Sequence, residues 1–95
     1  MGEAILNIAG YRFIDLPDRD DLHEPLKELC AKLELKGTIL LSLEGINFFL
    51  AASEPKIRQF IGELENDERF ADITLKESYT DYQPFNRMNV RLKKE

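Results

Sequence analysis

The chain has 95 residues, of which 43% are hydrophobic and 33% are charged, and its formal net charge is −5 at pH 7. This length suits one domain, and this composition excludes a disordered chain. The single cysteine, Cys30, excludes an intramolecular disulfide and a multi-cysteine metal site. The sequence has neither a signal-peptide pattern nor an apolar run near the roughly 18 residues of a membrane span, so we expect a cytoplasmic protein with no membrane partner.

The first predicted strand covers residues 4–16, which are rich in β-branched and aromatic side chains. Its apolar residues fall on two parities: Leu6 with Ile8, and Tyr11 with Phe13. We expect a bulge or bend near Gly10, because a bulge would let both pairs face one core.

A helix follows, marked by apolar residues at spacings of 4, 3, 1 and 3: Leu22, Leu26, Leu29, Cys30 and Leu33. Pro25 lacks an N–H, so the helix should begin around residues 21–24. Because Cys30 lies on the apolar stripe, we expect it to pack in the core rather than to react. Gly37 is predicted to separate this helix from the next element.

Residues 38–43 and 46–51 are two short apolar runs that are too close for a crossover helix, so they predict an antiparallel hairpin. Ser53 is a predicted N-cap, and Pro55 fits the first turn of a second helix that ends near Asn66. The apolar face of that helix contains Ile57, Phe60, Ile61 and Leu64.

Residues 73–79 alternate as a strand, and a final strand carries apolar Met88, Val90 and Leu92 between basic residues. The predicted order is βαββαβ plus a C-terminal strand. This order predicts one domain, residues 1–95, of the α+β class. Its expected fold is a ferredoxin-like, acylphosphatase-like split β-α-β sandwich, with two helices on one face of an antiparallel sheet.

Catalytic motifs are weak. His23 has no second histidine or cysteine beside it, so we expect a solvated side chain and no metal site. Acylphosphatase chemistry needs a phosphate-binding loop after the first strand, and this loop holds one arginine among four aspartates: Asp15, Asp18, Asp20 and Asp21. Four carboxylates would repel a phosphoryl group, so we disfavour this activity.

RNA-recognition folds have the same strand order and expose aromatic side chains for base stacking. Residues 44–51, EGINFFLA, keep the glycine and one aromatic of their third-strand pattern but begin with Glu44. Phe48 and Phe49 must point to opposite sheet faces, so we place Phe48 in the core and Phe49 on the open face beside Asn47. There Phe49 either stacks on a base or is covered by another domain, and we favour the second interpretation.

Three stretches carry a family resemblance: YRFIDLPD, KGTILLSLEGINFFLAAS and QPFNRMNVRLKKE. Together they resemble the N-terminal acylphosphatase-like domain of the bacterial rhodanese-related tRNA uridine hydroxylases. The most specific segments are Glu44-Gly45-Ile46-Asn47 and residues 87–95. Many members continue the first segment with Gly-Thr, whereas this chain has Phe48-Phe49.

The resemblance implies a longer parent protein that hydroxylates wobble uridine of tRNA to 5-hydroxyuridine in an oxygen-dependent reaction. The reactive cysteine of that family lies in a downstream rhodanese domain, and Cys30 does not match it. We therefore expect this domain to be inert by itself, to hold no cofactor or metal, and to contact tRNA, the rhodanese domain or both. The alternative is a stand-alone structural, protein-interaction or RNA-binding module.

Residues 84–95 carry a net charge of +3, while the preceding residues carry −8. The basic end is either a solvated terminal strand or an RNA contact that weakens with salt. The RNA-binding candidates are Arg87, Arg91 and Lys93 on one strand face, with Lys94 and Arg12. The motif or interface candidates are Glu44, Gly45, Asn47 and Phe49, although Glu44 and Asn47 could simply satisfy the backbone of a turn in which Gly45 has a positive φ.

Overall fold

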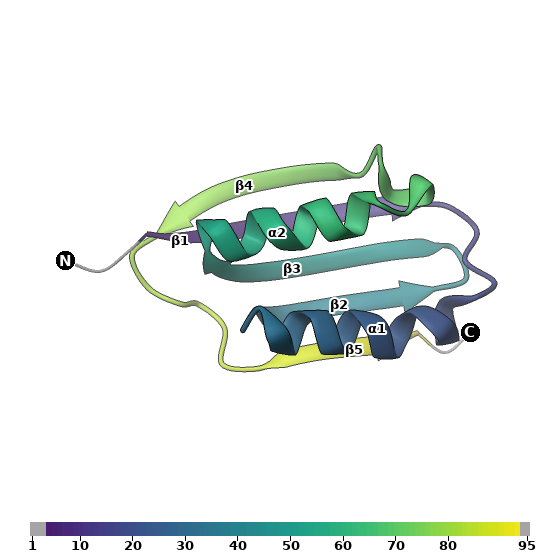
Figure 1. Ribbon diagram of the computed structural model, residues 1–95, viewed down its shortest axis with the longest axis horizontal. Helices are drawn as coiled ribbons and strands as arrows, with labels where there is room; N and C mark the ends of the chain where they lie inside the picture. The colour runs from purple at the N-terminus through teal and green to yellow at the C-terminus, as the bar shows by residue number, and fades with distance from the viewer. Residues whose placement is uncertain (1–3, 94–95) are drawn as a thin grey trace.

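The computed structural model describes residues 4–93, which form a five-stranded sheet covered by two α-helices (Figure 1). The elements in chain order are β1 (Ile5–Phe13), α1 (Arg19–Lys32), β2 (Lys36–Ser42), β3 (Gly45–Ser53), α2 (Glu54–Glu65), the 3-10 turn η1 (Glu68–Phe70), β4 (Thr74–Thr80) and β5 (Met88–Leu92). The predicted α+β order is confirmed, including the hairpin and the end of α2 near Asn66. Ser53 takes the predicted N-cap position, but its side chain makes no capping hydrogen bond.

The sheet has the strand order β4-β1-β3-β2-β5, which is the ferredoxin-like arrangement with a fifth strand added at one edge. The first three pairs are antiparallel, but β5 pairs with β2 in parallel. The expectation of an antiparallel sheet is therefore wrong at β5. The chain leaves β4 at one edge and crosses to the opposite edge through residues 81–87, so β5 runs in the same direction as β2 (Figure 1).

Both helices lie on one face of the sheet, with α2 along β1 and β3 and α1 along β2 and β5 (Figure 1). The core fills the space between the two layers. Phe48 of β3 meets Phe60 of α2 edge to face, with ring centroids 5.7 Å apart. Cys30 is completely buried, and desolvation raises the pKa of its thiol to about 12. Cys30 therefore packs in the core, as predicted.

Strand β1 runs straight past Gly10, so the predicted bulge is wrong. Its pairing with β3 continues without interruption from Ile5 to Phe13. A Cβ on Gly10 would lie 2.4 Å from Cζ of Phe48, so the glycine makes room for a core ring. Because the alternation is unbroken, Tyr11 and Phe13 point away from the helices instead of joining the core.

Two boundary predictions around α1 are also wrong. The helix begins at Arg19 with Pro25 inside it, because the carbonyl of Asp18 already accepts the amides of the first turn. The helix ends through Glu34, whose φ is +57°. Gly37 lies within β2 at φ +133°, and a Cβ there would be 1.9 Å from the carbonyl oxygen of Phe49. Gly37 thus permits close strand approach rather than breaking a helix.

Candidate nucleic-acid interface

The sheet face opposite the helices, called the open face below, carries the alternate residues of every strand. Strand register defines a row of four side chains across it, in the order Tyr11, Asn47, Leu40, Arg91. A second row is formed by Ala9, Phe49, Thr38 and Asn89. Adjacent strands lie about 4.8 Å apart, so residues within a row are direct neighbours.

Among the described strand residues, three aromatic side chains project from the open face. Phe49 is 53% exposed, as predicted for the partner of buried Phe48. Tyr11 and Phe13 are 46% and 79% exposed, and their ring centroids are 5.5 Å apart. The sequence interpretation missed these two residues as surface groups. Regular alternation along β1 would have predicted their exposure, but the expected bulge at Gly10 placed them in the core.

The open face is basic although the whole chain is acidic. Within residues 4–93, the open-face positions of the five strands include Lys36, Lys76 and Arg91 and hold neither aspartate nor glutamate. None of these three basic side chains forms an ion pair with another described residue. Together with Lys56, the larger cause, Lys36 helps to lower the pKa of the nearby Glu34. The charges of Lys76 and Arg91, by contrast, are available to an external anion.

Gly45 creates a hollow at one end of the open face. It lies between Phe13 and Ser42 in its row, and it contributes no side chain there. The hollow has a volume of about 350 Å³, and its lining includes Tyr11, Phe13, Ser42, Glu44, Asn47 and Lys93. Three of the predicted motif residues, Glu44, Gly45 and Asn47, and two of the predicted RNA-binding residues, Arg12 and Lys93, thus line one concave site.

The backbone at Gly45 requires glycine for two reasons. Its φ is +149°, and a Cβ would lie 2.0 Å from the carbonyl oxygen of Arg12. The predicted positive φ is confirmed. The turn itself is made by Leu43 and Glu44, and Gly45 begins β3. The amide of Glu44 donates a hydrogen bond to the hydroxyl of Ser42 at 3.2 Å, so the polar groups of the turn have a structural role.

The loop after β1 is closed against phosphate. The amides of Ile14 and Leu16 donate to the carbonyls of Glu44 and Leu43 at 2.9 and 3.1 Å, and Leu16 is fully buried. These two N–H groups cannot cradle an anion while they hold the hairpin. Acylphosphatase chemistry remains disfavoured, now by hydrogen bonding as well as by charge.

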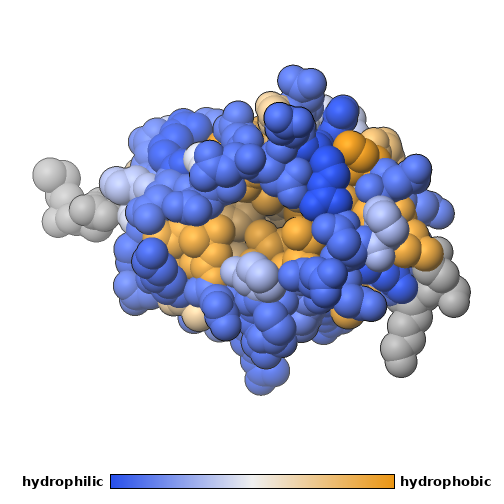
Figure 2. Space-filling view, turned by 45° about the vertical axis from the view of Figure 1, so that its right-hand side comes forward, coloured by the Kyte–Doolittle hydropathy of each residue, from blue (hydrophilic) through white to orange (hydrophobic). Residues whose placement is uncertain are grey.

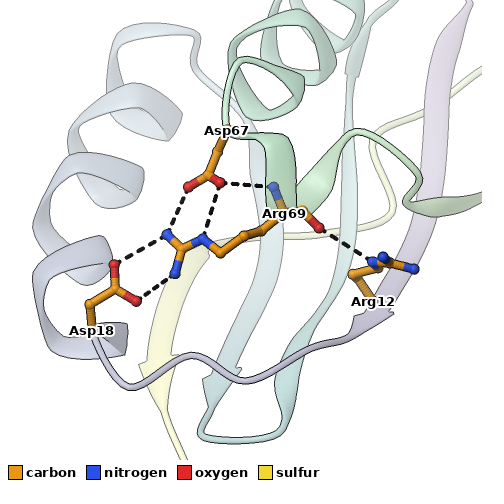
Figure 3. Close-up of polar contacts among 4 residues, drawn as sticks. All are labelled: Arg12, Asp18, Asp67 and Arg69. Atoms are coloured by element: carbon orange, nitrogen blue, oxygen red, sulfur yellow. Dashed lines mark hydrogen bonds and ion pairs between the residues drawn. The ribbon is translucent and has the colours of Figure 1, made fainter.

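The side chain of Arg12 lies apart from those of the other basic candidates, while its backbone borders the hollow at Gly45. Its parity places it on the helical side, and its Nε donates to the carbonyl of Arg69 at 3.3 Å (Figure 3). Arg69 in turn binds two carboxylates, Asp18 at 2.6 Å and Asp67 at 2.7 Å (Figure 3). These hydrogen bonds lower the pKa of both aspartates and raise the pKa of Arg69. The cluster joins η1 to the start of α1.

The other candidates at the C-terminal end differ in position. Arg91 lies on the open face, and Lys93 follows β5, where its amide donates to the carbonyl of Leu41 at 2.7 Å. Exposed Arg87 precedes β5, and its carbonyl accepts from the amide of Gly37 at 2.8 Å. Lys94 lies outside the described residues.

His23 has a structural contact instead of the expected solvated position. Its Nε2 donates to the carbonyl of Val90 at 2.7 Å, so it ties α1 to β5. In the part of the chain that the structure describes, no group of three or more His, Cys, Asp and Glu side chains is placed to hold a metal ion. The helices of that same part are too short or too polar to cross a membrane.

The helical face has a hollow of different character. It lies between the two helices, where Leu26 and Leu29 of α1 and Leu64 and Phe70 provide an apolar surface. Charged residues border it: the acidic Glu28 of α1, Glu63 of α2 and Asp67 between α2 and η1, and the basic Lys32 of α1. Figure 2 shows this apolar hollow enclosed by hydrophilic residues.

Together, the fold and surface define an acylphosphatase-like domain whose phosphate loop is closed and whose open face is basic and aromatic. Solved structures share the fold. Acylphosphatase from Bacillus subtilis gives a TM-score of 0.68 at 13% identity, covering 92% of this chain and 98% of that one. BlrB, a BLUF protein in its dark state, gives 0.73 at 14% identity, covering 97% and 74%.

Residues 5–95 match the family described as the UPF0176 acylphosphatase like domain, and the chain belongs to this family. Curated relatives carry the name tRNA uridine(34) hydroxylase. The one from Ralstonia nicotianae is 52% identical and the one from Cupriavidus pinatubonensis 53%, each over 91 residues and 96% of this chain. This chain spans 32% of the length of each of these two relatives.

Proposed function

We propose that this chain is the N-terminal, tRNA-binding domain of a cytoplasmic protein that hydroxylates uridine 34 of tRNA. The names of the relatives support the substrate, and the chain's coverage of about a third of their length leaves room for another domain. A downstream rhodanese domain would supply the reactive cysteine. The fully buried Cys30, whose thiol pKa is raised to about 12, is unsuited to that role.

The observation that carries the proposal is the separation of charge between the two sheet faces. Lys36, Lys76 and Arg91 lie on a face whose described strand positions hold no carboxylate. Lys93 continues the line of Arg91 past the end of β5. Phosphates of tRNA would bind along this line and release counterions, so affinity should fall with salt. Exposed aromatic side chains lie beside these basic residues, and this combination is more typical of an RNA-binding surface than of a surface that only contacts solvent.

A tRNA titration of the 95-residue chain tests this proposal at about 50 and 200 mM salt. The double variant Arg91→Glu with Lys93→Glu should bind roughly 10-fold or more weakly at the lower salt. The matched control, Lys27→Glu with Lys32→Glu, makes the same charge change on α1 and should bind as the wild type does.

Absence of wild-type tRNA binding at both salt concentrations would favour a structural module that docks another domain through Phe49. An equal loss in the α1 control would show that net charge matters rather than the open face. The chain by itself should form no 5-hydroxyuridine when incubated with tRNA and oxygen, as measured by mass spectrometry of digested nucleosides. Product formation would contradict the assignment of the chemistry to another domain.

A further inference from the structure

We propose that the hollow at Gly45 binds one unstacked RNA base, while Arg91 and Lys93 hold the adjoining phosphates. This inference rests on the proposed function and adds a base-binding site to it. The volume of about 350 Å³ falls at the lower end of the roughly 300–1,000 Å³ typical of small-ligand sites.

The walls of the hollow suit a flat heterocycle. Tyr11 and Phe13 form one side, and both rings are substantially exposed on the open face. Their ring planes are inclined by 56°, so the two rings do not stack flat on each other. Unstacked RNA bases commonly stack on aromatic side chains of this kind.

The polar groups of the hollow favour a base over a phosphate. Glu44 places a carboxylate at the rim, and a carboxylate repels a phosphate but accepts hydrogen bonds from base N–H groups. The exposed Asn47 can both donate and accept, as the edge of a base requires. Lys93 also lines the hollow, so a positive charge is adjacent for the backbone of the same nucleotide.

The floor of the hollow is also rigid. Gly45 cannot be replaced without collision with the Arg12 carbonyl, and the hairpin carbonyls of Leu43 and Glu44 are bonded to the loop after β1. Cross-strand pairing fixes Tyr11 opposite Asn47. The site is therefore formed before a ligand arrives, which lowers the entropic penalty of binding.

The test compares two ligands with equal phosphate charge: a mixed-sequence RNA octamer and a ribose-phosphate octamer that lacks bases. Binding to the 95-residue chain is measured by fluorescence anisotropy at about 50 mM salt. The wild type should bind the complete RNA at least about 5-fold more tightly. Phe13→Ala and Asn47→Ala should each reduce this preference, and their thermal unfolding should match the wild type because both residues are exposed.

The control variant is Tyr82→Ala, which removes another aromatic ring, 62% exposed, from the segment after β4. It should keep the full preference for bases. Equal wild-type affinity for the two octamers would overturn the base site and leave phosphate binding by the open face intact. Failure to bind either octamer, with loss of tRNA binding as well, would overturn both proposals and favour a protein partner on this face.

Discussion

The two faces of the sheet have opposite chemistry although they share every strand. On the helical side, three acidic residues and one lysine border an apolar hollow, and Arg58 and Arg69 are each bound to two carboxylates. On the open side, basic side chains and exposed aromatic side chains lie together. The net charge of −5 averages these two surfaces and hides the basic one. The whole-chain charge therefore does not describe the local charge of either face.

Neighbouring residues of β3 show the contrast at its sharpest. Phe48 is 1% exposed and Phe49 is 53% exposed. Phe48→Ala should lower the free energy of unfolding by about 3–5 kcal/mol, because it empties a core site against Phe60. Phe49→Ala should change it by less than about 1 kcal/mol. Urea denaturation at neutral pH measures both. Similar losses for the two variants would mean that the open face is packed rather than available.

Two glycines offer a second, smaller contrast. Gly45→Ala should destabilise the chain by roughly 1–3 kcal/mol, because φ of +149° and the Arg12 carbonyl both oppose a Cβ. Gly62 lies in α2 with open space around its Cα, so Gly62→Ala should stabilise by about 0.4–1 kcal/mol. Thermal unfolding of the two variants gives the signs. A stable Gly45→Ala chain would contradict the close approach of β1 to the hairpin.

The ion pairs of Arg69 should make the smallest contribution to the free energy of unfolding among the features compared here. They lower the pKa of Asp18 and Asp67, so their stabilisation is present above the unfolded-state pKa, about 3.9, and is lost as the pH falls through the lower folded-state values. Arg69→Gln should therefore lose stability at pH 7 and show a shallower acid decline in urea denaturation.

Lys27→Gln is the control for this change, since it removes a positive charge from α1 but not from the cluster. It should keep the wild-type acid profile. Because the cluster lies on the helical side, Arg69→Gln should also leave tRNA affinity unchanged at pH 7. A drop in tRNA affinity without unfolding would mean that the helical side also contributes to tRNA binding, which would contradict the assignment of this role to the open face.

Much of the fold was predictable from local patterns. The stripe of α2 and the alternation in β3 correctly placed Ile57, Phe60 and Phe48 in the core. Prediction failed where the role of a residue depends on its contact with a residue distant in the sequence. Gly10 looked like a bulge in β1, but its lack of a side chain accommodates Phe48 from β3. The candidate site was predicted in part: Glu44, Gly45 and Asn47 were named, while Tyr11 and Phe13 were assigned to the core.

The sequence by itself determined the element order, the hairpin and the opposite orientation of Phe48 and Phe49, because periodicity and turn chemistry act between near neighbours in the chain. Tertiary structure alone decided the parallel pairing of β5 with β2, which places Arg91 in the row of Asn47 and Tyr11. It also decided the hollow at Gly45, whose lining comes from separate strands. Such a site depends on strand register between distant segments, and that register is set by packing of the whole core.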